Sequence, residues 1–454
     1  MPKKKTALTI EERLQQALVP AEKQPYEVPE NWVWVRLGEV NKYISKSVNP
    51  ISEPDKIFEL YSVPSMVDNY PEIIAGSDIG SSKQSVCKKD VLLCKINPRI
   101  NRVWKVSQFT DNELIASSEW IIIRNNHIDA NYLMYCFQSK YFREFMLSNV
   151  SGVGGSLMRA QPKYVQTYPI PLPPLSEQQR IVERIEELFA KLDEAKERLQ
   201  EVADSFAVRK AAILHKAFTG ELTKQWRLEN GVSDESWEEK KGEDFFEYVT
   251  SGSRGWAKYY SDKGSIFVRM GNLNHGTIEL DLSDIQYVEL PDQVEGQRSK
   301  LQKNDILISI TADVVMIGLV REDMDAYINQ HVALARPKND LYAEFLAWYF
   351  VSDVGLQQMQ NKQRGATKIG LGLQDIRSII LKIPTLPEQH EIVRLIDDLL
   401  ARERSAQQAT EQALASIDLM KKSILARAFR GELGTNKASE ASALELLRQV
   451  LAEN

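Results

Sequence analysis

The chain contains the same long segment twice, and this repeat constrains its fold more than any other feature. Residues 175–222 align with residues 386–433 without a gap, and 18 of the 48 aligned positions are identical. The distance from Glu177 to Glu388 is 211 residues, and the same distance separates Glu221 from Glu432. A period this long indicates duplicated domains, since arrays of short repeats have periods of roughly 20–50 residues. A protein with two similar halves is suited to a two-part ligand, of which duplex DNA is the commonest.

Length and composition describe a globular protein with more than one domain. The 454 residues are 43% hydrophobic and 26% charged, which is typical of a folded chain with room for two to four domains. No apolar run approaches the ~20 residues that a membrane span needs. The segment Thr9–Leu14 predicts a capped amphipathic helix, without the apolar core of a signal peptide. The three cysteines form no Cys-x-x-Cys pair, so we expect a reducing cytoplasm.

The charge balance bears on DNA binding. A formal net charge of −6 argues mildly against a nucleic-acid partner. Much of the acid, however, lies in the first repeated segment, between Glu183 and Glu201. A basic cluster lies elsewhere, between Lys83 and Lys105. The charge distribution is therefore compatible with a DNA-binding surface outside the repeated segments.

Globular blocks alternate with long helical stretches. Val91–Ile96 and Trp120–Ile123 predict buried strands, residues 130–149 predict one helix with aromatic anchors, and residues 341–359 mirror it. We expect a mixed α/β (α+β) fold, in which two similar globular domains are separated by two long antiparallel coiled-coil helices. The predicted boundaries are 1–25 for an N-terminal helix, 26–170 for the first globular domain, 171–222 for the first long helix, 223–382 for the second globular domain, 383–434 for the second long helix and 435–454 for a C-terminal tail helix.

Proline-containing segments precede both long helices and force an extended backbone there. Beyond them, apolar residues recur at alternating steps of four and three, which predicts a coiled-coil seam. The seam of the second helix is poorer in large apolar residues, so we expect the two helices to pack on each other. The predicted seam residues are Ile181, Ile185, Leu188, Leu192, Leu199, Phe206, Ile213, Ile392, Ile396, Leu399, Ile417 and Ile424.

The length of these helices matters for a DNA ligand. About 43 residues at a rise of ~1.5 Å make a rod of roughly 65 Å, and the DNA duplex repeats every ~34–36 Å. Globular domains at opposite ends of such a rod could contact one side of DNA one to two turns apart. The pattern therefore predicts a rigid spacer between two DNA-reading domains.

Motifs for catalysis are missing from the sequence. No Asn or Asp precedes a Pro-Pro pair, as adenine methyltransferases require, and Asn97–Arg99 is only a distant approach. Residues 76–83 contain the glycines of a P-loop but lack its Gly-Lys-Ser/Thr ending. The five histidines have no metal-ligand spacing. We therefore expect no catalytic site and no metal or cofactor site in this chain.

The repeated motifs resemble those of the specificity subunits of type I restriction-modification enzymes. The resemblance covers nearly the whole chain. The segments that carry it are Pro171–Val182, Leu386–Val393, Lys216–Arg227, Ala428–Leu433 and Pro29–Trp34. One departure follows the second Gly-Glu-Leu, where Gly434–Asn436 replaces Thr-x-Gln-Trp-Arg. The role of the tail helix is therefore open, and packing near the N-terminal helix is one expectation.

The resemblance implies two target-recognition domains that each read half of an asymmetric, split DNA site. It also implies a bacterial or archaeal anti-phage system for DNA methylation and restriction. The partners would be two modification subunits, which bind S-adenosylmethionine and methylate adenine, and restriction subunits, which use ATP and Mg²⁺. The specificity chain itself would perform no chemistry.

Candidate DNA contacts are polar and basic residues in loops that flank the predicted strands. Arginine can bind a guanine edge through two hydrogen bonds, whereas lysine more often holds a phosphate. We expect about half of the candidates to be true contacts. The candidates are Ser82, Lys83, Lys95, Arg99 and Arg102 in the first domain, and Arg254, Lys258, Tyr259, Arg269, Asn272, Lys362, Arg364 and Lys368 in the second.

Two other interpretations fit parts of the sequence. The chain could be a coiled-coil scaffold whose globular domains bind protein, which heparin retention or a DNA gel shift would distinguish. It could also be a self-contained restriction enzyme, which methylation by the isolated chain would establish. The bases recognised and the length of the spacer between the half-sites do not follow from the sequence.

Overall fold

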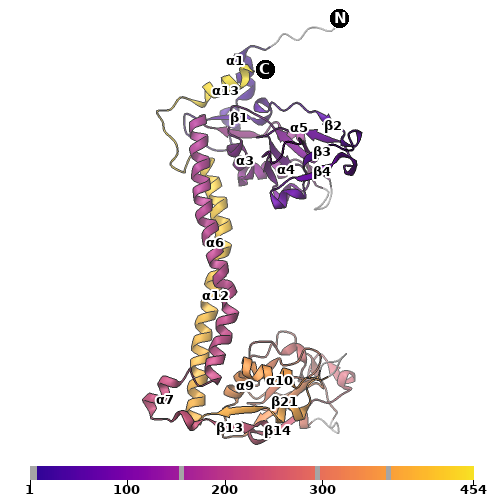
Figure 1. Ribbon diagram of the computed structural model, residues 1–454, viewed down its shortest axis with the longest axis vertical. Helices are drawn as coiled ribbons and strands as arrows, with labels where there is room; N and C mark the ends of the chain where they lie inside the picture. The colour runs from indigo at the N-terminus through magenta and orange to yellow at the C-terminus, as the bar shows by residue number, and fades with distance from the viewer. Residues whose placement is uncertain (1–7, 153–157, 292–296, 365–369, 454) are drawn as a thin grey trace. The chain divides into compact units, whose positions relative to one another are not determined.

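The structure is a computed structural model that describes residues 8–152, 158–291, 297–364 and 370–453. The chain divides into two compact units (Figure 1). Unit 1 comprises residues 1–198 and 413–454, and unit 2 comprises residues 199–412. Among the described residues, no helix combines the length and the apolar character needed to cross a membrane.

The helices range from single turns to two rods of more than forty residues. They are α1 Ile10–Ala17, α2 Leu37–Val40, α3 Ala130–Gln138, α4 Lys140–Ser148, α5 Pro162–Val165, α6 Leu175–Phe218, α7 Lys224–Asn230, α8 Gly242–Phe245, α9 Ala343–Val351, α10 Asp353–Asn361, α11 Leu373–Arg377, α12 Leu386–Ala428 and α13 Ala443–Ala452.

The strands are short. In unit 1 they are β1 Val33–Arg36, β2 Ser47–Val48, β3 Ile57–Tyr61, β4 Glu72–Ala75, β5 Lys83–Ser85, β6 Val91–Cys94, β7 Val103–Lys105, β8 Glu113–Ala116, β9 Trp120–Ile123, β10 Val150–Ser151, β11 Arg159–Ala160 and β12 Pro169–Leu172. In unit 2 they are β13 Glu238–Lys241, β14 Phe246–Ser251, β15 Tyr260–Ser261, β16 Ser265–Val268, β17 Tyr287–Val288, β18 Ile306–Ser309, β19 Ile317–Leu319, β20 Ala326–Ile328, β21 Val332–Pro337 and β22 Ile380–Ile383.

Unit 1 is built around two main sheets. A five-stranded sheet has the order β2-β5-β8-β3-β4, in which β3 and β8 are parallel, and a three-stranded sheet has the order β7-β6-β9. All four residues of β6 are buried because both faces of this strand are covered. Val91 and Leu93 pack into the core beneath α3, while Leu92 and Cys94 pack with Trp120 in a second core. The uninterrupted apolar run of β6 is the pattern expected of a strand buried on both faces.

Unit 2 repeats this arrangement. A four-stranded sheet has the order β14-β21-β18-β19, and a second has the order β15-β17-β16-β20 with β16 and β20 parallel. The central strand β18 is buried on both faces, since Ile306 and Ile308 belong to one core and Leu307 to another. The parallel pair β16 and β20 therefore corresponds to β3 and β8, and β18 corresponds to β6.

The two long helices pack antiparallel in each unit, as predicted (Figure 1). In unit 1 the beginning of α6 lies against the end of α12, where Ile185 shares a core with Leu425, and Lys421 forms an ion pair with Asp193. In unit 2 the end of α6 lies against the beginning of α12, where Leu214 shares a core with Ile396. Each long helix thus contributes one part to each unit.

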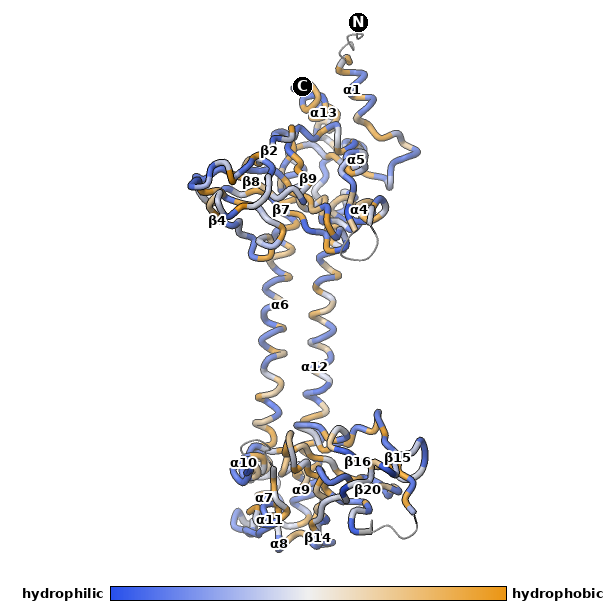
Figure 2. The backbone as a smooth tube through the Cα atoms, turned by 90° about the vertical axis from the view of Figure 1, so that its right-hand side faces the viewer, coloured by the Kyte–Doolittle hydropathy of each residue, from blue (hydrophilic) through white to orange (hydrophobic). Residues whose placement is uncertain are grey.

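The predicted seam residues are not equally buried. The two helices alternate between hydrophilic and hydrophobic residues along their length (Figure 2). The flanking residues Leu214, Leu400 and Leu425 are buried, although they were not among the predicted seam residues. Six predicted seam residues are buried, namely Ile181, Ile185, Phe206, Ile392, Ile396 and Ile417, and six are half-buried, namely Leu188, Leu192, Leu199, Ile213, Leu399 and Ile424.

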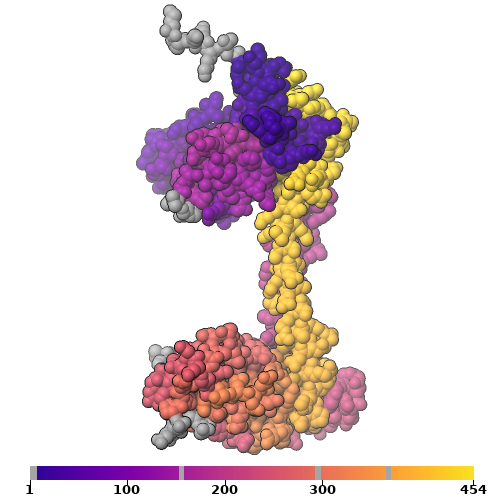
Figure 3. All heavy atoms as spheres, turned by 180° about the vertical axis from the view of Figure 1, so that it is seen from behind, coloured from indigo at the N-terminus to yellow at the C-terminus, as the bar shows by residue number. Residues whose placement is uncertain are grey.

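The segments that contain α1 and α13 lie together in unit 1 (Figure 3). Helix α13 packs on α1, and Leu14 shares a core with Leu447 and Leu451. The predicted cap of α1 is present, because Thr9 Oγ1 accepts from the Glu12 amide and the Glu12 side chain accepts from the Thr9 amide. The expectation that the tail helix packs near the N-terminal helix is therefore confirmed.

The prediction of a single helix at residues 130–149 is wrong. Two helices, α3 and α4, meet at Ser139, whose hydroxyl accepts from the Phe142 amide and caps α4. In unit 2, α9 and α10 meet in the same way at Ser352, which caps α10 through the Gly355 amide. Serine favours such caps over helix interiors because its hydroxyl competes for backbone groups.

Candidate nucleic-acid interface

Unit 2 contains a basic cavity of about 670 Å³ at the ends of several strands. It lies where the loop after β14, the turn between β20 and β21, and the start of the loop after β18 meet. Its charged lining residues are all cationic, and no carboxylate of the described residues lines it. The residues around it are Ser251, Gly252, Ser253, Arg254, Gly255, Trp256, Lys258, Tyr259, Arg298, Ile310, Thr311 and Gln330.

Gly252 allows the loop after β14 to lie directly against the turn between β20 and β21. A Cβ atom at this position would be 2.0 Å from the Ile328 carbonyl oxygen and 2.3 Å from that of Asn329. Ser253 also forms a parallel bridge with Asn329. A side chain at residue 252 would force these two backbone segments apart, so the contact depends on glycine.

The loop between β18 and β19 has a strained backbone. Ala312 has φ 62° and Val315 has φ 73°, a region that β-branched residues rarely occupy. Thr311, at the start of this loop, bridges to Gly370 and lines the cavity. Such strain is often concentrated at functional sites, and here it lies beside the basic cavity.

Three of the candidate residues in unit 2 line this cavity. Arg254 and Lys258 are exposed, and the Lys258 ammonium lies 4.9 Å from the centre of the Tyr259 ring. The structure thus brings together Arg254, Lys258 and Tyr259, whose polarity and loop position predict DNA contacts.

The remaining candidates in unit 2 lie elsewhere. Arg269 forms an ion pair with Asp284 at 3.1 Å. Arg364 forms one with Asp375 at 3.0 Å, and Lys362 is half-buried. Lys368 lies outside the described residues.

The structure does not place Asn272, a predicted DNA contact, at the surface of its loop. Its side chain is buried, with its amide nitrogen bonded to the carbonyl oxygens of Asp281 and Asp284. Its side-chain oxygen accepts from the Arg269 amide. Asn272 therefore supports its own loop, because every polar group of the side chain is used inside the fold.

In unit 1 the corresponding turn, Ser117–Glu119, connects β8 to β9 and gathers several polar side chains. Lys95 donates to the Ser118 carbonyl at 2.6 Å, and Gln84 donates to that of Ser117 at 3.1 Å. Arg159 forms an ion pair with Glu119 at 3.4 Å. Side chains from three separate segments, namely β5, the loop after β6 and β11, thus meet at this turn.

Of the other candidates in unit 1, Lys83 begins β5, whereas Ser82, Arg99 and Arg102 lie outside the strands and α-helices. Ser82 is exposed, and the Lys83 ammonium bonds to Ser81 Oγ at 2.6 Å. Burial lowers the pKa of Lys83. Arg99 is exposed on a short 3₁₀ turn at Pro98–Ile100, while Arg102 is half-buried.

Sequence reasoning missed Arg298, Thr311 and Gln330 in unit 2, and Gln84 and Arg159 in unit 1. None of them lies in a motif, and only Gln84 falls within a charged segment, the basic cluster between Lys83 and Lys105. They meet the candidate residues only because distant segments of the chain come together in the fold, so no local signal in the sequence marks their position.

The Glu-Gln pairs of the repeat fix how each long helix begins. Gln178 accepts from the Asp129 amide at 2.9 Å and donates to the Pro173 carbonyl at 2.9 Å. Gln389 accepts from the Tyr342 amide at 3.0 Å and donates to the Pro384 carbonyl at 2.9 Å. Each glutamine therefore ties a long helix to the start of α3 or α9. Because both amide groups are satisfied, these glutamines can be buried without penalty.

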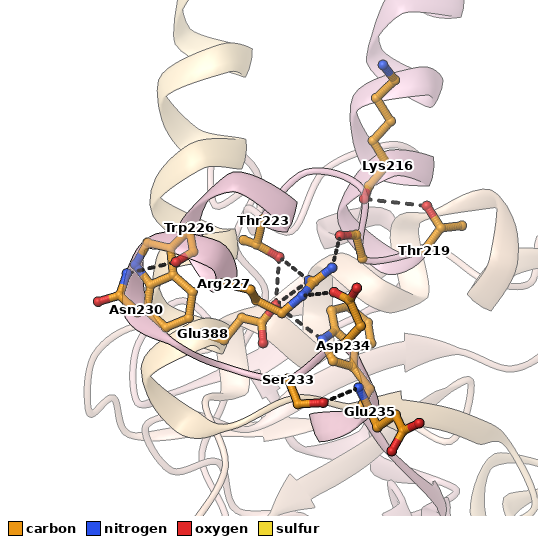
Figure 4. A network of polar contacts seen from close by, with 12 residues as sticks. Lys216, Thr219, Thr223, Trp226, Arg227, Asn230, Ser233, Asp234, Glu235 and Glu388 are labelled. Atoms are coloured by element: carbon orange, nitrogen blue, oxygen red, sulfur yellow. Dashed lines mark hydrogen bonds and ion pairs between the residues drawn. The ribbon is translucent and has the colours of Figure 1, made fainter.

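Glu388 is the centre of a buried polar network at the end of α6 (Figure 4). Its Oε1 atom accepts from Thr223 Oγ1 at 2.7 Å, from Arg227 Nη1 at 2.7 Å and from Trp237 Nε1 at 3.1 Å. Burial disfavours the Arg227 charge, but hydrogen bonds to Glu388 and Asp234 outweigh it and raise the pKa of Arg227. These hydrogen bonds join the Gly-Glu-Leu-Thr-x-Gln-Trp-Arg motif, which follows α6, to the Leu-Pro-Glu-Gln motif at the start of α12.

Glu177 occupies the equivalent position in unit 1, where it accepts hydrogen bonds from neutral donors. Trp32 Nε1 lies 2.7 Å and Asn436 Nδ2 lies 2.9 Å from Glu177 Oε2. Thr435 Oγ1 lies 3.4 Å from Oε1. After the second Gly-Glu-Leu, the Asn436 amide thus donates to Glu177 as the Arg227 guanidinium donates to Glu388 in unit 2. The Glu177 carboxylate therefore remains hydrogen-bonded.

The described residues contain no group of three or more His, Cys, Asp or Glu side chains that could hold a metal ion. Cys87, Cys94 and Cys136 are free thiols. The cavity of unit 2 and the Ser117–Glu119 turn of unit 1 present cationic and amide side chains that can contact nucleic acid.

The chain matches a known protein family along most of its length. The model of the family described as "Type I restriction modification DNA specificity domain" matches residues 29–204 and again residues 234–414. The two matches cover equivalent parts of the internal repeat.

Relatives of this family support the match. The EcoBI specificity subunit of a type I restriction enzyme of Escherichia coli is 31% identical over 306 residues, which are 63% of this chain and 64% of that subunit. This match thus spans just under two thirds of that relative's length. The crystal structure of the HsdS subunit from Thermoanaerobacter tengcongensis has a TM-score of 0.66 at 21% identity, covering 90% of this chain and 99% of that one. At this identity the likeness concerns the fold.

Proposed function

Because the chain belongs to the family of type I restriction-modification DNA specificity subunits, we propose that it selects the DNA sequence for such a complex and catalyses no reaction itself. Each unit reads one half of a bipartite site. The observation that carries this proposal is the basic cavity of unit 2, whose charged lining residues, among those described, are three cations. Cationic loops at strand ends are suited to phosphates and base edges.

The interface of each unit lies at the loops around its inter-strand turn. In unit 2 these loops supply Arg254, Lys258 and Tyr259, and in unit 1 they supply Lys95 and Arg99. Ser82, Lys83 and Arg102 complete the proposed interface of unit 1, whereas Arg269, Lys362 and Arg364 contribute more weakly because they are paired or half-buried. The long helices set the spacing between the two half-sites.

The complex contains two modification subunits, which dock on the long helices, and restriction subunits that join through them. The modification subunits bind S-adenosylmethionine and methylate adenine, and the restriction subunits use ATP and Mg²⁺. The complex acts on DNA in the cytoplasm of a bacterium or archaeon. The family of the chain supports these assignments, and purification of the complex with its subunits in a defined ratio tests them.

Substitutions in unit 2 test the DNA contacts. The complex is assembled with its modification subunits, and its binding site is selected from a random DNA library. Lys258→Ala should weaken binding of all sequences and reduce the slope of log K against log salt by about one. Arg254→Ala should reduce discrimination at one base pair of one half-site by about tenfold.

Lys240→Ala is the matched control. It removes one positive charge from the same unit, on β13, which pairs with β22 away from the cavity loops. Its affinity and salt slope should equal those of the unmodified complex. If Arg254→Ala and Lys258→Ala also bind as the unmodified complex does, the cavity is not part of the DNA interface.

A further inference from the structure

The turn between β20 and β21 carries a side chain that is well placed to read a base. Gln330, which is half-buried, lines the basic cavity together with Arg254 and Thr311. The backbone of the turn is fixed from two sides. The Asn329 side chain accepts from the His331 amide at 3.0 Å, and the loop at Gly252 lies directly against the Ile328 and Asn329 carbonyls.

The Gln330 amide is oriented by a chain of hydrogen bonds through His331. Gln330 Nε2 lies 3.0 Å from His331 Nε2, and His331 Nδ1 lies 2.6 Å from Thr311 Oγ1. Because an amide nitrogen only donates, His331 Nε2 must accept, so the ring carries its proton on Nδ1 and donates it to Thr311. The His331 ring, itself hydrogen-bonded to Thr311, therefore holds the end of the Gln330 side chain beside the cavity.

This orientation leaves one acceptor and one donor of Gln330 for a ligand. Within the described part of the chain, Gln330 Oε1 and the second hydrogen of Nε2 have no hydrogen-bond partner. The major-groove edge of adenine presents the complementary pair, because its N6 amino group donates and its N7 atom accepts. The neighbouring cations Arg254, Lys258 and Arg298 supply the attraction that holds DNA against the cavity.

We propose that Gln330 reads one adenine in the half-site bound by unit 2, and that His331 and Thr311 are positioning residues for its amide. This inference rests on the proposed function. It concerns unit 2 alone, because the equivalent turn of unit 1 contains Ser118 and Glu119, which contact Lys95 and Arg159 instead. The two units therefore read their half-sites through different side chains.

The test measures base preference with the complete complex on DNA libraries randomised at each half-site in turn. Gln330→Ala and Gln330→Met should each reduce the preference for adenine at one base pair by about tenfold. Methionine keeps the length of the side chain without its donor and acceptor. The preference in the other half-site and the salt dependence of binding should not change.

Variants of Thr311 test the positioning role. Thr311→Val removes the oxygen that receives the His331 proton and should reduce the preference at the same base pair, whereas Thr311→Ser keeps this oxygen and should restore it. A complex in which both Gln330 variants retain every base preference would overturn the inference while leaving the proposed function intact. So would loss of preference at all positions together, since that would indicate a structural role. An unmodified complex without any base preference would contradict the proposed function itself.

Discussion

At the scale of single residues, two equivalent buried glutamates show how the repeat has diverged. Glu388 and Glu177 are both fully buried, and each joins the start of a long helix to the segment that follows a Gly-Glu-Leu sequence. Glu388 contacts a guanidinium at 2.7 Å, whereas Glu177 contacts an indole N–H and an amide. The same position is thus held by an ion pair in one unit and by neutral hydrogen bonds in the other.

This difference predicts unequal effects of the same substitution. Glu388→Gln leaves Arg227 buried without its full counter-charge, and breaking a buried ion pair costs about 3–5 kcal/mol. Glu177→Gln replaces a carboxylate that accepts from neutral donors and should cost about 1–2 kcal/mol through poorer hydrogen bonds. Denaturant unfolding, monitored by hydrogen exchange of the α7 and α13 amides, measures the loss of stability in each variant. Equal losses of stability would contradict the assigned networks.

At the scale of elements, close contact between loops shapes the proposed interface. The Gly252 backbone leaves no room for a side chain, whereas a Cβ atom at Gly271 of the same unit would have no described atom within 4 Å. Gly252→Ala should therefore displace the loop that carries Arg254 and weaken DNA binding by about tenfold or more, since a backbone shift moves several contacts together. Gly271→Ala is the control and should bind normally. The DNA affinities of the Gly252→Ala and Gly271→Ala complexes test this prediction. Equal affinities would show that the close contact at Gly252 is not needed for DNA binding.

A second element, the C-terminal tail, is held to α6 by a paired charge. Arg180 Nη1 and Nη2 lie 2.9 and 2.7 Å from the two carboxylate oxygens of Glu440. This hydrogen-bonded pair lowers the pKa of Glu440. A lowered pKa in the folded state means that the carboxylate stabilises tail docking above the ordinary glutamate pKa of about 4.3. This contribution is lost as the pH falls through the lowered folded-state pKa.

Hydrogen exchange of the α13 amides as a function of pH tests the predicted loss of tail docking at low pH. Protection of its amides should decrease as the pH falls below about 4.3, and Glu440→Gln should make the protection lower at neutral pH and flatten its pH dependence. If the α13 amides of Glu440→Gln keep the same protection at neutral pH, the ion pair does not hold the tail.

The elements also show which features a sequence can reveal. The repeat aligned the two long helices correctly because their helical periodicity and their Glu-Gln openings are local patterns. The break at Ser139 was missed because a serine between two aromatic helical segments reads as part of one helix until its hydroxyl is seen to cap α4. Gln330 and Thr311 were missed because only the folded chain brings their loops together. The polarity of Asn272 predicts a contact with a ligand, but its hydrogen bonds point into the fold.

At the scale of the whole molecule, the chain is two copies of one domain plan joined by the repeat. Each unit contains a parallel strand pair, a central strand buried on both faces and a pair of short helices that meet at a serine. Helices α1 and α13 share a core in unit 1. The turns of the proposed recognition loops, in contrast, carry different side chains, namely Ser118 and Glu119 in unit 1 and Gln330 and His331 in unit 2. A common scaffold with different loops would account for the proposed asymmetric split site.

The most direct test of this account is a domain exchange with sequence mapping. Residues 26–170 are replaced by the corresponding block of another family member, and methylated adenines are mapped across the genome of a host that expresses the complete complex. The account predicts that one half of the recognised sequence changes, while the other half and the spacer length stay the same. A change in both halves, or in the spacer, would contradict the claim that each unit reads its own half-site.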